Sequence, residues 1–160
     1  MNAYDRVEWG FIEKLMEQLG FHERWASLIM HCITTITYSI LINGVAHGCI
    51  VPSRGLRQGD PLLSSLFLLC ADGFSSLIND AARNNKLSGV TISRGGPMVT
   101  HLFFTDDSLL FCKASIQECQ ELRAIHDLYE VASGQKSMQI SPQFSLAIIV
   151  HLSLKMSCWK

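Results

Sequence analysis

The stretch from residue 101 to residue 112 constrains the fold of this chain more than any other. An apolar, aromatic-rich run leads through Thr105 into two adjacent aspartates, Asp106 and Asp107, and a second apolar run follows. This pattern predicts a β-hairpin with both carboxylates at its tip. Paired carboxylates on a tight turn between buried strands offer the oxygen ligands that Mg²⁺ prefers. Ordinary turn chemistry is the alternative, because aspartate tolerates turn dihedral angles and caps its own backbone.

Composition places the chain among folded proteins. Its 160 residues suit one domain with a proper core, and 48% hydrophobic against 17% charged residues indicate no disordered tail. The formal net charge is −1, whereas a free-standing nucleic-acid binder usually carries a basic face. If nucleic acid is the partner, the positive surface must be local or must belong to other parts of a larger protein.

Six cysteines indicate a reducing environment. They stand at positions 32, 49, 70, 112, 119 and 158, form no Cys-x-x-Cys pair and lie mostly inside apolar runs. We therefore expect buried thiols in an intracellular compartment, the nucleus or the cytoplasm, and neither disulfides nor zinc. The first residues show no signal-peptide pattern, and the most apolar runs, 62–71 and 146–154, are too short to span a bilayer. No membrane association is expected.

Two helices are predicted at the start of the chain. Asp5 and Glu8 have the spacing of a capping box, and apolar residues at helical spacing follow as far as Gly20. The second helix is expected over residues 22–33. Its predicted apolar face consists of Trp25, Leu28, Ile29 and Cys32.

A hairpin and a polar loop come next. β-branched runs flank Asn43 and Gly44, which predicts strands over residues 36–43 and 45–51. The following loop, residues 52–60, has almost no apolar content and is rich in glycine and arginine. It ends at Asp60, which suits the N-cap of a helix over residues 62–84.

The second half of the chain mixes strands with one further helix. Strands are predicted over residues 87–92, 99–104 and 109–113, and an amphipathic helix over residues 117–133 ends at Gly134. Helices and hairpins alternate without a regular βαβ pattern. The fold class is therefore α+β, with a small antiparallel sheet packed on helices.

Four stretches resemble, in sequence and in order, motifs of the reverse transcriptases of plant LINE-type (non-LTR) retrotransposons. They are residues 3–9, Ala-Tyr-Asp-Arg-Val-Glu-Trp; residues 52–62, Pro-Ser-Arg-Gly-Leu-Arg-Gln-Gly-Asp-Pro-Leu; residues 101–107, His-Leu-Phe-Phe-Thr-Asp-Asp; and residues 132–136, Ala-Ser-Gly-Gln-Lys. The resemblance implies that residues 1–136 form part of a polymerase palm with adjoining finger elements. In that fold the Asp-Asp stretch is the catalytic hairpin.

The resemblance also implies an activity, namely RNA-directed DNA synthesis by nucleotidyl transfer. Two Mg²⁺ ions about 3.5 to 4 Å apart stabilise the attacking and leaving oxygens in such a transfer. By resemblance, Asp106 is the principal ligand of both ions and Asp107 is the second carboxylate. The implied partners are an RNA template, a DNA primer and deoxynucleotides, together with the finger, thumb and endonuclease regions of the full element.

Five further residues match binding positions of the family. Tyr4 falls where the family has an aromatic ring that excludes a ribose 2′-hydroxyl. Gln58 and Gly59 fall where the backbone comes close to the nucleotide and the template, which a residue without Cβ permits. Arg54 and Arg57 could meet phosphates. The alternative for both arginines is a solvated position on a surface loop.

One departure from the family pattern bears on activity. The family's first metal-binding aspartate stands five residues before the aromatic gate, so counting back from Tyr4 passes Met1 before reaching it. These 160 residues therefore hold two of the family's three carboxylates. Asp5 is not expected to substitute, because it has the role of a helix cap. The palm sheet would also lack a strand beside the Asp106 hairpin, and the chain is expected to be inactive on its own.

The last part of the chain, residues 137–160, diverges from the family pattern. After Lys136 the family usually continues Ile-Asn, whereas here the chain reads Ser-Met-Gln-Ile. Codons for this segment can be chosen so that another reading frame gives the family motif. We therefore hypothesise a frameshift at Lys136 and expect the tail to pack poorly. Sequencing the locus tests this, since the hypothesis requires a frame that restores the motif.

Two other functions are compatible with the sequence. The first is an inactive, non-enzymatic remnant of a retroelement. The second is a palm relative with a different role, such as an intron maturase, although the Phe-x-Asp-Asp form and the 52–62 loop favour the LINE type. Primer extension on an RNA template separates the enzyme from the remnant.

Overall fold

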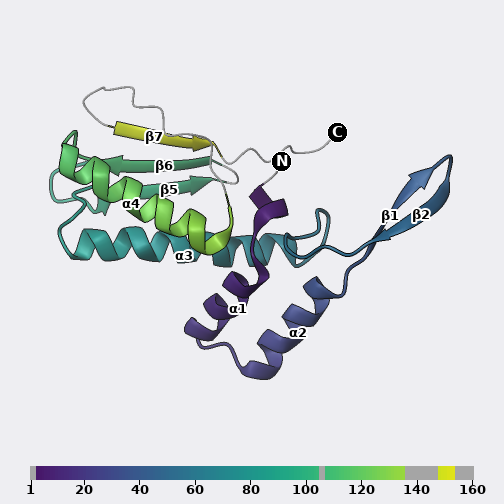
Figure 1. Ribbon diagram of the computed structural model, residues 1–160. Helices are drawn as coiled ribbons and strands as arrows, with labels where there is room; N and C mark the ends of the chain where they lie inside the picture. Colours follow the sequence, from purple (N-terminus) through teal and green to yellow (C-terminus); the bar gives the residue numbers. More distant parts are fainter. Residues whose placement is uncertain (1–2, 105–106, 136–147, 154–160) are drawn as a thin grey trace.

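The computed structural model describes residues 3–104, 107–135 and 148–153, and the side chains of residues 5–104 and 108–135. Its elements in chain order are η1 (Ala3–Arg6), α1 (Trp9–Gln18), α2 (Glu23–Thr34), β1 (Tyr38–Ile42), β2 (Val45–Ile50), α3 (Leu63–Arg83), β3 (Val90–Thr91), β4 (Met98–Val99), β5 (His101–Phe104), β6 (Asp107–Cys112), α4 (Ile116–Ser133) and β7 (Ile148–Ser153). Helices and antiparallel strands mix in one chain (Figure 1). The α+β class is confirmed.

The helix α1 begins later than a cap at Asp5 would allow. Residues Ala3–Arg6 form a 3₁₀ turn, and the N-cap of α1 is Glu8, which has extended dihedral angles and makes no side-chain capping bond. The predicted capping box at Asp5 is therefore wrong. The chain needs the intervening residues to leave the 3₁₀ turn before the α-helix starts. The predicted end at Gly20 is confirmed.

The helix α2 buries a different face from the predicted one. Ala26, Ile29 and Ile33 are buried, whereas Trp25 is 54% and Leu28 is 52% exposed. The apolar residues of α2 surround more than half of the helix, so the sequence pattern allowed two faces. The narrower face, with its small alanine, is the one that packs against α1 and the start of α3. This first core comprises Val7, Ile12, Met16, Ala26, Ile29, Ile33, Leu56, Leu66 and Cys70.

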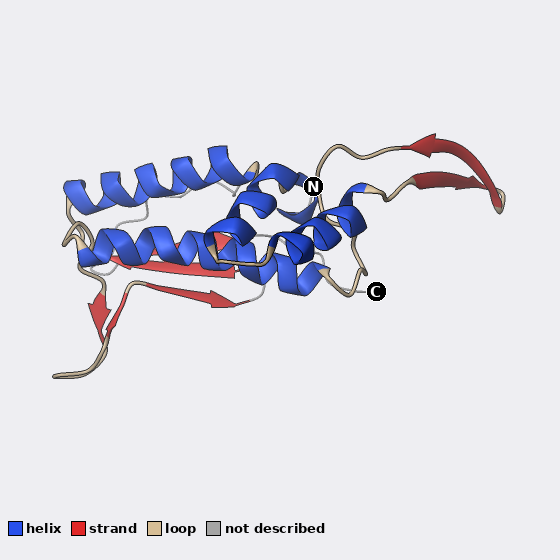
Figure 2. Cartoon of the chain, turned by 90° about the horizontal axis from the view of Figure 1, so that it is seen from below, coloured by secondary structure: helices blue, strands red, loops and turns tan. Residues whose placement is uncertain are grey.

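The predicted hairpin between α2 and α3 is confirmed as β1 and β2. Asn43 and Gly44 both have positive φ, 50° and 80°, as the tightest hairpin turns require. The strands pair only with each other among the described residues, and all of their residues are exposed. The hairpin extends away from the rest of the molecule (Figures 1 and 2).

The long helix α3 confirms the predicted helix to within one residue at each end. Its N-cap is Leu62 and not Asp60 as predicted. Asp60 instead caps the preceding turn, where its Oδ1 accepts a hydrogen bond from Leu62 N at 2.8 Å. The turn of Pro61 and Leu62 thus separates the capping aspartate from the helix.

The first two strands predicted after α3 are shorter or divided in the structure, whereas the third, predicted over residues 109–113, is the longer β6 (Asp107–Cys112). Residues 87–92 contribute only the two-residue strand β3, which pairs with β4. Thr100 O then accepts a hydrogen bond from Phe111 N at 2.8 Å. The chain therefore changes partners at Thr100, from β3 to β6, and one long predicted strand becomes β4 and β5.

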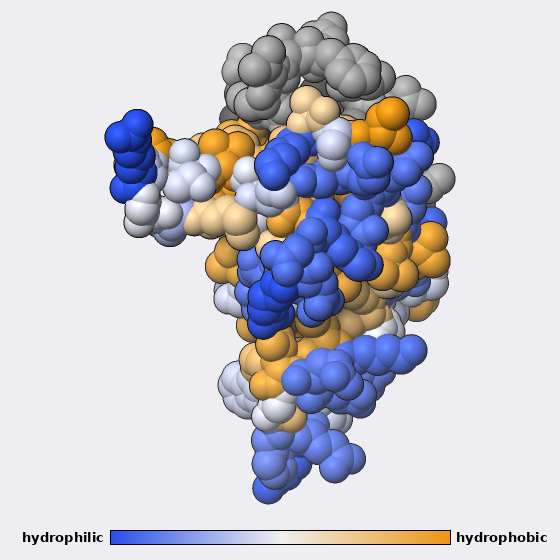
Figure 3. Space-filling view, turned by 90° about the vertical axis from the view of Figure 1, so that its left-hand side faces the viewer, coloured by the Kyte–Doolittle hydropathy of each residue, from blue (hydrophilic) through white to orange (hydrophobic). Residues whose placement is uncertain are grey.

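A second core lies between the sheet and the helices α3 and α4. It comprises Phe74, Ile78, Ala81, Leu87, Leu110, Cys112, Leu122, Ile125 and Tyr129. The predicted helix before Gly134 is confirmed as α4, which is capped by Ser115 at its start and by Gly134 in a left-handed conformation at its end. At the end of the molecule where α3 finishes and α4 begins, the surface is largely hydrophilic, with hydrophobic groups between (Figure 3).

The strand β7 comes from the tail that was expected to pack poorly. Its backbone pairs with the whole of β6, from Asp107 opposite Ser153 to Cys112 opposite Ile148, which gives the sheet order β5-β6-β7. The proposed frameshift position, Lys136, and residues 137–147 and 154–160 lie outside the described part. Among the described residues, no helix is both long enough and apolar enough to cross a membrane.

Candidate functional site

Three of the four motifs meet around residues 3–9. The backbone of the 52–62 loop docks on this segment, because Gly55 N donates to Val7 O at 2.8 Å. Trp9 Nε1 in turn donates to Gly55 O at 2.8 Å. Leu56 is 5% exposed and anchors the loop in the first core. The loop is therefore held by both its backbone and one apolar side chain.

Gly55 is the point of closest approach between the two motifs. Its φ is +88°, and a Cβ added there would lie 2.8 Å from Asp5 O. Only glycine fits such a position without a shift of backbone. Gly59, which the sequence predicts to lie close to the nucleotide and the template, has φ +86°, and no described atom of the chain lies within 4 Å of an added Cβ. Its glycine is required by the turn in which Asp60 N donates to Arg57 O.

The two arginines of the loop differ in their surroundings. Arg54 Nη1 lies 3.2 Å from Glu8 Oε1, and the two side chains are 48% and 44% exposed. Such an exposed pair contributes little to stability. It nevertheless directs Arg54 toward the start of α1. Arg57 and Gln58 are exposed on the outer side of the loop.

The end of α4 contacts the same segment from another direction. Glu8 N donates to Ser133 O at 2.9 Å. A Cβ on Gly134 would lie 2.7 Å from Arg6 O. Residues 5–9 thus contact both the 52–62 loop and the 132–136 motif. Tyr4 itself lies in η1 and is described by its backbone only.

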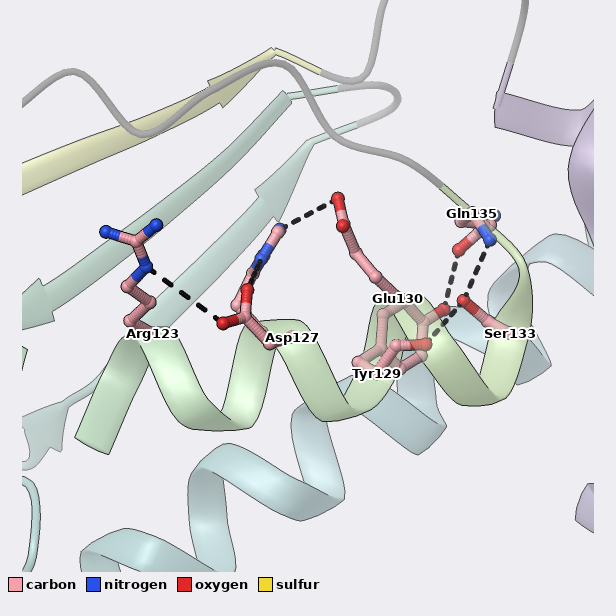
Figure 4. Close-up of polar contacts among 7 residues, drawn as sticks. Arg123, Asp127, Tyr129, Glu130, Ser133 and Gln135 are labelled. Atoms are coloured by element: carbon pink, nitrogen blue, oxygen red, sulfur yellow. Dashed lines mark hydrogen bonds and ion pairs between the residues drawn. The ribbon is translucent and has the colours of Figure 1, made fainter. Parts of the chain in front are cut away.

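A buried polar network fixes the end of α4 (Figure 4). Tyr129 Oη lies 3.0 Å from Cys70 O and 2.8 Å from Gln135 Oε1. One hydroxyl hydrogen serves one acceptor, and among the described residues Gln135 Nε2 has no partner. Flipping the amide lets Nε2 donate to the Tyr129 hydroxyl while that hydroxyl donates to Cys70 O. We assign this orientation because the Tyr129 hydroxyl then donates one hydrogen bond, to Cys70 O, and accepts one, from Gln135 Nε2.

Glu118 is a structural residue that sequence analysis missed. Ser115-x-x-Glu118 has capping-box spacing, and Ser115 Oγ does accept from Glu118 N at 3.2 Å. The Glu118 carboxylate, however, accepts from Ser88 N, Ser88 Oγ and Lys113 N at 2.7 to 3.0 Å. Burial alone would raise its pKa, but these hydrogen bonds outweigh burial and lower the pKa. Glu118 therefore ties the end of β6 to the segment after α3.

The Asp-Asp hairpin rests on the middle of α3. The rings of Phe103 and Phe74 stack with centroids 5.7 Å apart. Ser75 Oγ lies 2.8 Å from His101 Nε2, and burial lowers the pKa of His101. The helix that follows the 52–62 loop is therefore also the support of the hairpin.

The carboxylates themselves are only partly described. Phe104 pairs with Asp107 across the hairpin, and Asp107 is the first residue of β6. Its side chain and the whole of Asp106 lie outside the described residues. Among the side chains that the structure describes, no group of three or more His, Cys, Asp or Glu residues could hold a metal ion.

The structure describes five cysteines, of which Cys70 and Cys112 are buried. All five are free, and burial raises the pKa of both Cys70 and Cys112 to about 12. Thiols with raised pKa are poor nucleophiles. The expectation of buried thiols is wrong for Cys32 and Cys49, which are exposed.

Comparison with known proteins decides the family. The family described as reverse transcriptase (RNA-dependent DNA polymerase) matches residues 1–144. The chain belongs to the reverse transcriptase family. The resemblance of its four motifs is thereby confirmed, and so is the fold class, as part of a reverse transcriptase palm.

Individual relatives include proteins of a retrotransposable element and of a transposon. The Pol polyprotein of the type-1 retrotransposable element R2 of Popillia japonica is 28% identical over 108 residues, 68% of this chain and 17% of that protein. The 149 kDa protein of transposon TX1 of Xenopus laevis is 24% identical over 127 residues, 76% of this chain and 9% of that protein. An uncharacterized mitochondrial protein of Arabidopsis thaliana is 46% identical over 68 residues, 42% of this chain and 56% of that protein. The chain thus spans from about a tenth to just over half of these relatives.

Proposed function

We propose that this chain supplies two parts of the RNA-directed DNA polymerase of a plant non-LTR retrotransposon. They are the catalytic hairpin with Asp106 and Asp107, and the 52–62 loop, which would contact the nucleotide. The observation that carries the proposal is the match of the reverse transcriptase family over residues 1–144. The packing of the 3–9, 52–62 and 132–136 motifs around one another supports it. Motifs that are far apart in sequence come together where they share a task.

In this proposal Asp106 and Asp107 hold Mg²⁺. The described side chains offer no alternative cluster for the ion, and the hairpin carboxylates are of the hard oxygen type that Mg²⁺ requires. When bound, the metal neutralises charge on the transferring phosphoryl group. The protein's own contribution is positioning, because the stacked Phe103 and Phe74 rings hold the hairpin on α3.

The other sequence-derived residues take binding roles in this proposal. Tyr4 would select deoxynucleotides. Arg57, Gln58 and Gly59 would face the nucleotide and the RNA template, since the loop presents them outward. Arg54 would instead orient the loop through Glu8. The DNA primer and the finger, thumb and endonuclease regions complete the set of partners, and the five free cysteines support an intracellular, reducing location.

Metal binding can be tested without any catalytic assay. Mn²⁺ added to isotope-labelled protein should broaden the backbone NMR signals of residues near the hairpin first. The double variant Asp106→Asn, Asp107→Asn should lose this broadening. The matched control is Asp127→Asn, whose side chain is 64% exposed on α4, and which should retain it. Broadening centred elsewhere, or equal in both variants, would contradict the assignment.

Polymerase activity needs a second experiment. These residues hold two of the family's three carboxylates, so we expect no primer extension by the 160-residue chain with an RNA template, Mg²⁺ and deoxynucleotides. Joining to this chain the family segments that carry the third carboxylate and the finger and thumb regions should restore extension. Asp106→Asn should abolish the restored activity. Failure of the extended chain to copy RNA, with metal binding intact, would favour the alternative of a non-enzymatic remnant.

A further inference from the structure

Two cysteines meet where β6 ends and α4 begins. Cys112 is the last residue of β6, and Cys119 lies near the start of α4. Cys112 is 2% exposed and belongs to the second core, against which Cys119 packs. The two side chains share a hydrogen bond. Among the five cysteines that the structure describes, this is the pair in such contact.

The segment between the two cysteines is tied together by hydrogen bonds. Glu118 Oε2 accepts from Lys113 N at 3.0 Å, which joins the residues that stand next to the two cysteines. Cys119 N donates to Ser115 O at 3.1 Å, and Ser115 N donates to Lys113 O at 2.7 Å. The folded chain therefore holds the two thiols together without any change of the loop.

The two thiols differ in their access to solvent. Cys112 is buried, whereas Cys119 is partly exposed. Burial is the main cause that raises the pKa of Cys112 to about 12, and the neighbouring Cys119 raises it further. The thiolate, not the thiol, attacks a disulfide. An oxidant from solution therefore reaches Cys119 first, and Cys112 reacts from within the fold afterwards.

We propose that Cys112 and Cys119 are a redox site, which forms a reversible disulfide with glutathione disulfide as the oxidant. The Cys119 sulfur attacks one sulfur of the oxidant, the S–S bond of the oxidant breaks, and one glutathione leaves with the proton of Cys119. The Cys112 sulfur then attacks the Cys119 sulfur of the mixed disulfide, and the second glutathione leaves with the proton of Cys112. Two protein thiols are thus oxidised, and one glutathione disulfide is reduced to two thiols.

The disulfide links the strand of the Asp-Asp hairpin to α4. β6 begins at Asp107 and ends at Cys112, so the bond lies at the opposite end of this strand from the carboxylate. A cross-link of this kind stabilises a protein mainly by restricting the unfolded chain. The proposal does not depend on the polymerase function proposed above, and the free thiols of the structure are the reduced state.

Peptide mapping of the folded 160-residue chain tests the proposal. The reduced chain is incubated with glutathione disulfide, the remaining thiols are blocked, and the tryptic peptides are analysed by mass spectrometry. Trypsin cleaves after Lys113, between the two cysteines, so the bond holds two peptides together. We expect this linked pair, and we expect dithiothreitol to separate it. Cys32 and Cys49, which are exposed, should not be linked to each other.

Two variants and one stability measurement make the test specific. Cys119→Ser should leave Cys112 as a free thiol, whereas the matched control Cys32→Ser should keep the linked pair. The oxidised natural chain should melt about 5 to 10 °C above the reduced chain. Cys119 that carries glutathione beside a free Cys112 would overturn the proposal. A lower melting temperature of the linked chain would also overturn it, because the bond would then belong to an opened chain.

Discussion

Single residues in this chain act through backbone contacts more than through side-chain chemistry. Gly55 gives both backbone groups to the 3–9 segment, and Glu118 uses its carboxylate to pair backbone N–H groups. The motif order alone predicted that the 52–62 loop and the 3–9 segment belong to one site. It did not predict that Gly55, and not another residue of the loop, makes the closest approach to that segment. That distinction depends on φ angles and on the distance to Asp5 O, which a sequence does not carry.

Gly55→Ala should destabilise the protein more than Gly59→Ala. Both residues have positive φ, so each substitution costs about 1 to 2 kcal/mol from backbone strain. Only at Gly55 does the new Cβ also meet a backbone oxygen, at 2.8 Å. We expect an additional cost of about 1 to 3 kcal/mol there. Urea denaturation followed by circular dichroism measures both, and equal losses would show that the loop moves freely at Gly55.

Glu118 should make stability depend on acid pH. Its pKa is lowered in the folded protein, because hydrogen bonds from Ser88 and Lys113 favour the carboxylate over the opposing effect of burial. The corresponding stability is therefore present above the unfolded pKa of about 4.3 and is lost as pH falls through the lower folded pKa.

Glu118→Gln should remove this part of the pH dependence. The variant should be less stable by about 1 to 2 kcal/mol at neutral pH, because a neutral amide is a weaker acceptor for the three donors. The free energy of unfolding, measured between pH 7 and pH 3, should then fall less steeply than in the natural chain. A parallel fall in both proteins would assign the acid sensitivity to other carboxylates.

At the level of elements, the sequence predicted the helices well and the strands less well. Apolar spacing located α1, α3 and α4, and Gly20 and Gly134 marked the ends of α1 and α4, because helix periodicity and these end signals are local, although the caps predicted at Asp5 and Asp60 were wrong. The division of residues 98–104 into β4 and β5 depends on a bond from Phe111 to Thr100, which is distant in sequence. The buried face of α2 likewise depends on its neighbours.

One buried hydroxyl group adds a polar link to the apolar contact between α4 and α3. Tyr129 is 8% exposed, and its Oη lies next to Cys70 O and the Gln135 amide. Tyr129→Phe keeps the ring packing but leaves those buried groups without their partner, at a cost of about 1 to 3 kcal/mol. Leu128→Ala changes a side chain that is 57% exposed. It should lower the free energy of unfolding by much less than Tyr129→Phe does. Thermal and urea unfolding of both variants should rank them in that order.

The whole molecule is built on two cores that share one helix. α3 contributes Leu66 and Cys70 to the first core and Phe74 and Ile78 to the second. The sequence predicted a single domain. A chain with two hydrophobic cores can form a single domain when both cores are built on the same helix, as they are here on α3. The placement of Asp106 and the division at Lys136 stay predictions, because those residues lie outside the described part.

Unfolding should accordingly be a single transition. Leu66→Ala and Ile78→Ala each remove a side chain that is at most 2% exposed, and each should cost about 2 to 5 kcal/mol. Both variants should shift the circular dichroism and tryptophan fluorescence curves together, although two of the three tryptophans, Trp9 and Trp25, lie in the first half of the chain. A fluorescence curve unchanged by Ile78→Ala would show that the two cores unfold separately.

The shared helix also determines where the length of this chain can change. Inside α3, one inserted residue would rotate everything after it by about 100° and move it by about 1.5 Å. An insertion between Leu66 and Phe74 would thus turn the hairpin support away from the 52–62 loop. The turn around Gly95, where an added Cβ meets nothing within 4 Å, imposes no such spacing. Relatives that keep the same site should therefore vary in length at that turn and keep the interval within α3 constant.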